Sequence, residues 1–191
     1  MKSSILVLSL LSTLSLAAHA APNDGIVGAY ARVEVGRSNL VPSSTLPRAS
    51  TDEHGQAIKV FTGYRFNETL GVEAGYAALG SFSESVTVGG ASVTQDGKAR
   101  SIFGAATGRL PLSESFAVHG RLGLSSGKVS GTNVLPAGDN LMGSKTSVLF
   151  GLGAEYRPTP NVALTVNYDS YGMLSNTVKA SALVFGLHFT L

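Results

Sequence analysis

Three histidines outside the first twenty residues are the side chains most suited to acid–base or metal chemistry. His54 lies in the segment STDEHGQ, close to Ser50, Asp52 and Glu53. This grouping contains a base, two carboxylates and a hydroxyl, which could serve a metal or a catalytic step. Such a site needs ligands that a rigid scaffold holds in place, and a polar loop offers no such support. We therefore expect no metal, no cofactor and no catalysis at this segment.

The other two histidines, His119 and His188, lie in stretches where apolar residues alternate with other residues. Alternation of this kind is typical of β-strands. We interpret both histidines as members of a polar network on one strand face. The segment GGASVTQDG is rich in glycine, but no helical pattern follows it, so it is not a phosphate-binding loop. The sequence thus predicts a protein that is not an enzyme.

The composition limits the classes of partner. The chain has 191 residues, of which 43% are hydrophobic and 14% are charged, whereas about 25% are charged in an average soluble protein. The formal net charge of +2 is too small to indicate a nucleic-acid partner. Because the chain has no cysteine, it has no disulfide, thiol nucleophile or thiolate metal site.

The first twenty residues form a separate unit, MKSSILVLSLLSTLSLAAHA. A lysine near the start, an apolar stretch and a small-x-small ending are typical of a secretory signal peptide. We expect a signal peptide over residues 1–20, with cleavage between Ala20 and Ala21, and a single domain over residues 21–191. An uncleaved anchor is the alternative, but serines interrupt the apolar stretch.

Eight alternating segments follow, and no helical period competes with them. They are long for soluble strands but close to the roughly 9–11 residues that cross a bilayer as a tilted strand. Short connections (67–70, 111–115, 158–161) alternate with longer ones (37–56, 81–97, 126–145, with 172–178 intermediate), as in outer-membrane barrels. The segments are 26–36, 57–66, 71–80, 98–110, 116–125, 146–157, 162–171 and 179–191.

Each segment has one apolar face and one mixed face that carries charges and glycines. If the mixed face points inward, all strand charges except Arg109 and Lys179 lie inside the barrel. Lys98 and Arg100 are then among the inward charges. The position of Arg109 implies either a bulge in its strand or a side chain at the membrane edge. An isolated buried charge is costly, so these groups must pair. We predict a lumen network that fills the barrel and leaves no open pore. Its members are Arg32, Glu34, Lys59, Arg65, Glu73, Arg121 and Glu155.

A soluble lipocalin-like barrel, with the same apolar face turned inward, is the structural alternative. Three features favour the membrane. The mixed face is rich in glycine, including Gly104, which gives room to long charged side chains in a narrow lumen. Charged residues are too few to solvate an outer surface. Aromatic residues gather near the short turns and indicate a periplasmic girdle, with Tyr168 and Tyr171 as candidates for the opposite one. The predicted girdle is Tyr64, Phe66, Phe116, Tyr156 and Phe189.

The segments GYRFNETLGVEAGYAALG, RLPLSESFAVHGRLGLSSG, TSVLFGLGAEYRPTPNVALTVNYDSYG and VFGLHFTL resemble the OmpA-like outer-membrane β-barrel family, in particular its small OmpX/Ail-type members. The resemblance covers nearly all of residues 21–191. It implies an all-β fold, an eight-stranded antiparallel up-and-down transmembrane barrel with short periplasmic turns and longer external loops. Chains of this family usually end in an aromatic residue that the assembly machinery reads, and Leu191 takes that place here. We expect no peptidoglycan-binding domain after the barrel, so that role is not implied.

The resemblance also bears on function. It implies the outer membrane of a Gram-negative bacterium, and as partners the membrane lipids, lipopolysaccharide and the assembly machinery. It favours a monomeric, non-enzymatic protein that supports envelope integrity or binds host or matrix molecules by its external loops. The alternatives are a narrow channel for small solutes and a lipid A-modifying enzyme. The His-x-Ser pattern of a deacylase is absent, because Gly120 and Arg121 follow His119.

Overall fold

The computed structural model describes residues 27–42, 48–52, 54–88, 91–131 and 141–191. The predicted signal peptide and its cleavage site at Ala20 and Ala21 lie outside the described residues. Nine strands make up almost all of the described chain. They are β1 (Gly28–Pro42), β2 (Arg48–Asp52), β3 (His54–Arg65), β4 (Leu70–Val88), β5 (Ala91–Pro111), β6 (Phe116–Gly131), β7 (Gly143–Thr159), β8 (Val162–Met173) and β9 (Val178–Thr190).

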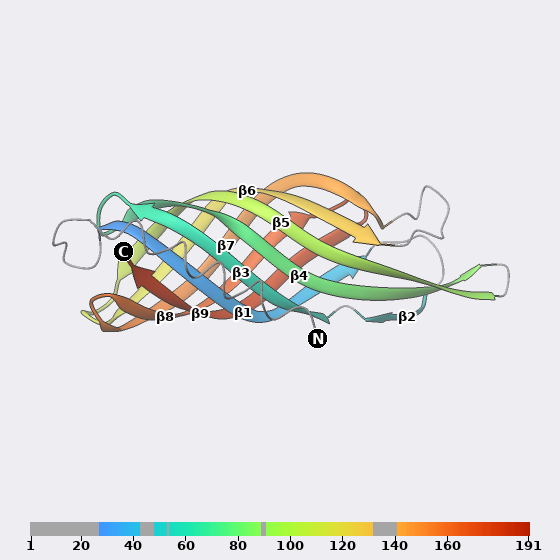
Figure 1. Cartoon of the computed structure of the whole chain (residues 1–191), viewed down its shortest axis with the longest axis horizontal. Coiled ribbons are helices and arrows are strands. Elements are labelled where there is room, and N and C mark those ends of the chain that lie inside the picture. The colour runs from blue at the N-terminus through green and yellow to red at the C-terminus, as the bar shows by residue number, and fades with distance from the viewer. Residues whose placement is uncertain (1–26, 43–47, 53, 89–90, 132–140) are drawn as a thin grey trace.

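The nine strands form a closed barrel with eight strand positions around its circumference. Every strand pairs antiparallel with its neighbours, and the first long strand, β1, pairs with the last, β9. The short β2 and the long β3 both pair with β4, one after the other along its length, so together they occupy one of these eight positions. Pairing of β4 with β5 completes the ring. The eight-stranded up-and-down barrel that the sequence predicts is confirmed (Figure 1).

Alternation along the strands sets the inside and the outside of the wall. In β1 the burial of successive residues alternates over the whole strand. It alternates in β6 as well, and in β7 from Ser147 to Arg157. Large apolar side chains such as Val35, Ile102 and Leu122 are about half exposed or more, although they belong to the most hydrophobic parts of the chain. An apolar outer belt around a closed sheet is the arrangement that a lipid environment requires, since closure leaves no unpaired backbone edge.

The two ends of the barrel differ. Tight turns at residues 66–70 and 112–116 lie at the end that also holds the C-terminus, and each is closed by backbone hydrogen bonds, such as Phe66 N to Leu70 O at 2.9 Å. At the other end the strands run on, and the β4–β5 hairpin projects farthest (Figure 1). We call these ends the turn end and the hairpin end. Among the described residues, no helix is long and apolar enough to cross a membrane.

The long connections predicted from the sequence are largely strand in the structure. The segment 81–97 is mostly the outer part of the β4–β5 hairpin, and 126–145 includes the last residues of β6 and the first of β7. His54, expected in a loop, is the first residue of β3. These segments are rich in Ser, Thr and Gly, which favour turns, but continuous pairing between neighbouring strands overrides that preference.

Candidate functional site: the barrel interior and its wall

Glu155 on β7 is the centre of the charged interior at the turn end. Arg32 Nη2 lies 3.1 Å from Glu155 Oε2, and Arg109 Nε and Arg157 Nη2 lie 3.2 and 3.0 Å from Oε1. Arg65 Nη2 is 3.9 Å from Oε2. All five side chains are buried. A single carboxylate thus contacts guanidinium groups from β1, β3, β5 and its own strand, and so links four strands of the barrel.

A second ion-pair cluster follows along the axis, centred on Lys59 and Arg121. Lys59 Nζ lies 2.6 Å from Asp169 Oδ2 and 3.1 Å from Glu34 Oε2. Arg121 Nε lies 3.5 Å from Glu73 Oε2 and 3.6 Å from Asp169 Oδ1. The Tyr30 hydroxyl donates to Glu73 Oε1 at 2.8 Å. Glu73 on β4 therefore points into the barrel and has two partners there, Tyr30 and Arg121.

The two interior histidines are bound within the same polar network. His188 Nδ1 accepts a hydrogen bond of 2.7 Å from Arg32 Nε, and the His188 ring stacks on Tyr30 with centroids 4.7 Å apart. His119 Nε2 is 2.6 Å from Asn167 Oδ1. In neither of these hydrogen bonds is the partner of the histidine a serine or a threonine that could act as a nucleophile. In the part of the chain that the structure describes, no group of three or more His, Cys, Asp or Glu could hold a metal ion.

All seven residues of the predicted lumen network lie inside, each at most 4% exposed. They are Arg32, Glu34, Lys59, Arg65, Glu73, Arg121 and Glu155. The structure adds Tyr30, Arg109, Arg157 and Asp169 to the network. The sequence pattern places Arg157 and Asp169 on the inward face, but neither is among the predicted network members. For Tyr30, Arg157 and Asp169 the signal was present, since each occupies the same parity as a charged neighbour on its strand.

The parity predicted for β5 is wrong. Arg109 is buried at 6% exposure and pairs with Glu155, whereas Lys98, Arg100 and Gly104 face outward. No bulge separates these residues, because the β5–β6 register runs without a break from Gly97 to Pro111. The strand reaches well beyond the apolar belt, so Lys98 and Arg100 lie outside that belt and need no interior partner.

Toward the hairpin end the buried side chains are mostly apolar, with a few serines such as Ser38 and Ser125 among them. Phe61 and Phe103 mark the boundary, with Lys59 Nζ 4.5 Å from the Phe61 ring centroid and 5.1 Å from that of Phe103. Beyond them lie buried leucines from several strands and, at Leu141 and Leu174, from the connections next to β7 and β8. Leu40, Leu79, Leu141, Leu149 and Leu174 are all fully buried at 0% exposure. The lumen is thus filled by charge at one end and by hydrocarbon at the other.

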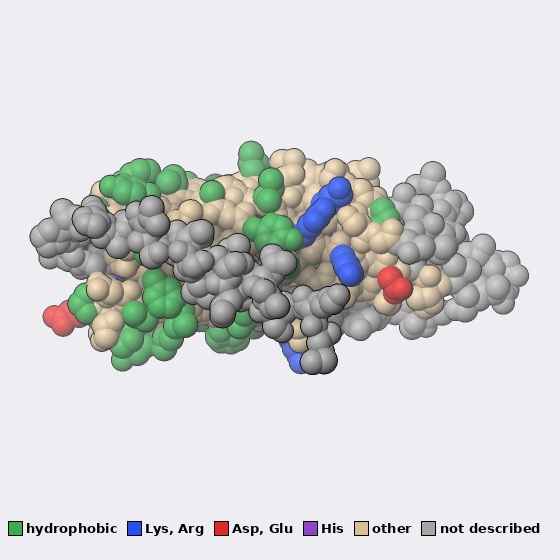
Figure 2. Space-filling model, viewed as in Figure 1, with side chains coloured by type: hydrophobic (Ala, Val, Ile, Leu, Met, Phe, Trp, Pro, Cys, Tyr) green, Lys and Arg blue, Asp and Glu red, His purple; other side chains and the backbone are tan. Residues whose placement is uncertain are grey.

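The outer surface carries the apolar belt (Figure 2). The five residues predicted as a periplasmic girdle are on this surface near the turn end, 40 to 57% exposed. Two ring pairs form among them: Phe116 with Tyr156 at 4.7 Å, and Tyr64 with Phe66 at 5.6 Å. Tyr168 also faces outward, but Tyr171 is fully buried, because its parity is that of Asp169. The proposal of Tyr171 in an opposite girdle is therefore wrong.

Comparison with known proteins agrees with this geometry. The family of outer membrane protein beta-barrel domains matches residues 6–190. Ail, the attachment invasion locus protein of Yersinia pestis, is a similar structure with a TM-score of 0.58 and 20% identity, covering 85% of this chain and 97% of Ail. Neisserial surface protein A has a TM-score of 0.59 and 18% identity, with 86% and 97% covered. OprG of Pseudomonas aeruginosa has a TM-score of 0.59 and 14% identity, with 89% and 100% covered. Comparison with curated protein sequences gives no match.

Proposed function

Because the chain belongs to the family of outer membrane protein β-barrel domains, and so to the outer membrane of a Gram-negative bacterium, we propose that it is a non-enzymatic surface protein that binds external ligands at its hairpin end. On this assignment the turn end faces the periplasm. The aromatic residues near the turns then form the girdle at the periplasmic interface.

The observation that carries the proposal is the length of the β4–β5 hairpin. Among the residues of these two strands whose burial the structure describes, the large apolar outward side chains stop at Tyr76 and Ile102, which pair directly, but the strands continue to Val88 and Ala91. Pairing is maintained through Ser83, Glu84 and Ser85, so the hairpin is an ordered ladder beyond the belt. An ordered projection with polar side chains provides a surface on which an external molecule can bind.

The filled interior argues against a conduit. Among the described residues, ion pairs occupy the half of the lumen near the turns, and mostly apolar side chains occupy the other half, an arrangement that does not favour the passage of polar solutes. A channel function would require a conductance well above background in planar bilayers. Because the side chains of one chain fill the lumen and its strands close the barrel, these features also support a monomer.

One similar structure supports an external ligand in particular. Ail of Yersinia pestis was solved in complex with the heparin analogue sucrose octasulfate, and that structure has a TM-score of 0.53 and 19% identity to this chain. For the present protein we infer the same general mode, a soluble or matrix molecule bound from outside. A lipid A-modifying enzyme is less well supported, because His119 is hydrogen-bonded to Asn167 and His188 accepts a hydrogen bond from Arg32. Mass spectrometry of lipid A from cells with and without the gene tests that alternative.

The experiment is to replace residues 84–95 by a two-residue turn and to display the variant on cells of a non-adherent strain. We expect attachment to immobilised heparin and to matrix proteins to fall to background. The barrel should still fold, because the shortened β4–β5 ladder keeps Ser83 with Asp96 and every pair nearer the turn end, although the short β2 loses its partners at residues 84–86. The matched control is Glu68→Gln together with Glu114→Gln, which alters exposed charges at the turn end. Unchanged attachment by the hairpin variant would refute the proposal.

A further inference from the structure

We propose that the outer wall of the barrel carries a binding site for the phosphate of a lipopolysaccharide molecule in the outer leaflet, formed by Lys98 and Arg100 on β5 and Lys128 on β6. The site lies on the outer wall at the border of the apolar belt, not on the projecting part of the hairpin. It therefore concerns a membrane component and is independent of the external ligand proposed above.

The three cations are close together and unpaired. Arg100 and Lys128 are direct cross-strand partners, and Lys98 pairs with Ser130, two residues beyond Lys128. All three side chains are exposed. No salt bridge joins them to any acid among the described residues. Like charges directly opposite each other destabilise a strand pair. A bound anion between them removes that repulsion, and phosphate is well matched to Arg and Lys donors.

The cluster lies where the apolar belt ends. One step along the same face toward the turns, Tyr76 on β4 pairs with Ile102 on β5, and these side chains are 40% and 60% exposed. On β6 the last large apolar residue before Lys128 is Leu124, at 60% exposure. An acyl chain that lies along Tyr76, Ile102 and Leu124 would bring its phosphorylated head group to the level of the three cations.

An open groove adjoins the cluster between β4, β5 and β6. Its lining includes Tyr76, Ala78, Ser81, Lys98, Arg100 and Ser130. The groove coincides with a register shift in the β4–β5 ladder between Ala78 and Ser81, where Gly80 has a φ of 81°. The shift places small side chains next to the cations, which leaves room for a sugar or a phosphate, and the two serines supply hydroxyl donors.

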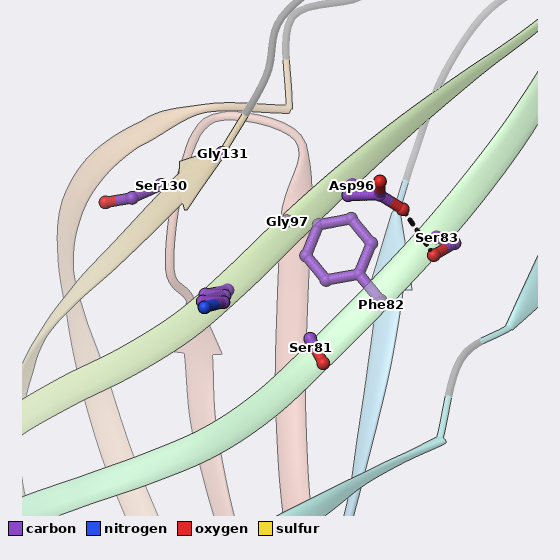
Figure 3. A pocket seen from close by; sticks show the side chains of 8 residues that line it. Ser81, Phe82, Ser83, Asp96, Gly97, Ser130 and Gly131 are labelled. Carbon is purple, nitrogen blue, oxygen red and sulfur yellow. Dashed lines mark hydrogen bonds between the residues drawn. The ribbon is translucent and has the colours of Figure 1, made fainter. Parts of the chain in front are cut away.

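Toward the barrel interior the groove is lined by Ala99, which is 4% exposed. An adjoining pocket is lined by Ser81, Phe82, Ser83 and Asp96, and the buried Phe82 ring lies beside Gly97 (Figure 3). The Asp96 carboxylate accepts a hydrogen bond of 2.6 Å from the Ser83 hydroxyl and limits the cationic site on the side of the hairpin tip. The site is therefore a feature of the outer wall, open to the membrane border.

The distribution of exposed charge fits the asymmetry of the membrane. Toward the hairpin end, the exposed charged residues of described burial are six cations and one acid, whereas the exposed charges at the turn end are Glu68 and Glu114. Anionic lipid surfaces attract clusters of Lys and Arg. The six cations are Arg37, Lys98, Arg100, Lys128, Lys145 and Lys179, and the acid is Asp96.

The test is native mass spectrometry of the folded protein from outer membranes, titrated in detergent with bis-phosphorylated lipid A. We expect Arg100→Gln with Lys128→Gln to raise the dissociation constant about tenfold, as for the loss of charge-assisted hydrogen bonds to one phosphate. The matched control is Arg37→Gln with Lys179→Gln, which removes the same charge on β1 and β9 and should leave the constant within about twofold. The boiled-against-unboiled gel shift confirms folding of both variants.

Three results would overturn the proposal. Equal weakening in both double variants would mean diffuse attraction without a site. Equal affinity of the native protein for dephosphorylated lipid A would mean that the phosphate is not recognised. Displacement of lipid A by millimolar inorganic phosphate would mean that the site takes free phosphate, without a contribution from the acyl chain along Tyr76 and Ile102. As a further positive result, Asp96→Asn should strengthen binding, because it removes the neighbouring negative charge.

Discussion

The interior of the barrel has two halves that are filled by different means. Toward the turns, Glu155, Arg32 and Arg109 belong to a set of paired charges that joins strands far apart in the chain. Toward the hairpin end, Leu79, Leu149 and Leu174 are buried among apolar neighbours. The charged half depends on specific partners, because a buried charge that loses its partner is costly. The stability of the apolar half depends on how well its side chains fill the available volume, because a close-packed interior tolerates neither a cavity nor an oversized side chain. The comparison predicts different sensitivities to substitution.

The largest expected effect is that of Glu155→Gln. The substitution keeps the shape of the side chain but leaves Arg32, Arg109 and Arg157 without their carboxylate. We expect a loss of about 3–5 kcal/mol in the free energy of unfolding. Urea unfolding in detergent micelles, followed by the mobility of unboiled protein on gels, measures it. Glu114→Gln at an exposed turn is the control, and equal midpoints for the two variants would contradict the role assigned to Glu155.

Leu149→Ala tests the apolar half, with an expected loss of about 3 kcal/mol from lost burial and the cavity that remains. Leu152→Ala on the same strand is its matched control, because Leu152 faces outward at 57% exposure and its removal leaves no cavity. The loss at Leu149 should exceed that at Leu152 by about 1–3 kcal/mol. If the two losses are equal, the hairpin half of the lumen is not packed in the way described.

Glu73→Ala should have the smallest effect of the three, about 2 kcal/mol. It removes the acceptor of the Tyr30 hydroxyl and one partner of Arg121, but Arg121 retains Asp169 at 3.6 Å. The same unfolding measurement applies. A loss as large as that of Glu155→Gln would show that the charged half acts as a single network without a central carboxylate. No loss would mean that Glu73 does not pair in the lumen.

Much of this arrangement could be predicted from the sequence, because parity in a strand decides which face a side chain occupies. Arg32 with Glu34, and Glu155 with Arg157, share a parity and share the interior. The pairing partners could not be predicted in the same way. Lys59 on β3, for example, pairs with Asp169 on β8, although β3 and β8 are not neighbours in the sheet. This contact depends on the stagger of the strands and on the narrow width of the lumen.

The error in β5 has a definite cause. Lys98 and Arg100 share one parity and Arg109 has the other, so a rule that turns most charges inward selects the wrong face. The rule holds only for residues within the apolar belt, and β5 extends from Ala91 to Pro111, beyond that belt. The apolar half of the lumen was missed for a related reason. Leu40 and Val129 lie in strand extensions whose composition is typical of loops.

The seam between β1 and β9 has a consequence for assembly kinetics. It joins the two strands that lie farthest apart in the chain, with Tyr30 opposite Thr190 and Arg32 opposite His188. Until it closes, both edges keep unpaired backbone groups, which hydrocarbon does not tolerate, and Arg32 lacks its contact with His188. An open sheet is therefore unstable in the bilayer core. Insertion and closure must proceed together, so we expect no long-lived half-inserted intermediate, and a catalyst of assembly must shield both edges until they meet.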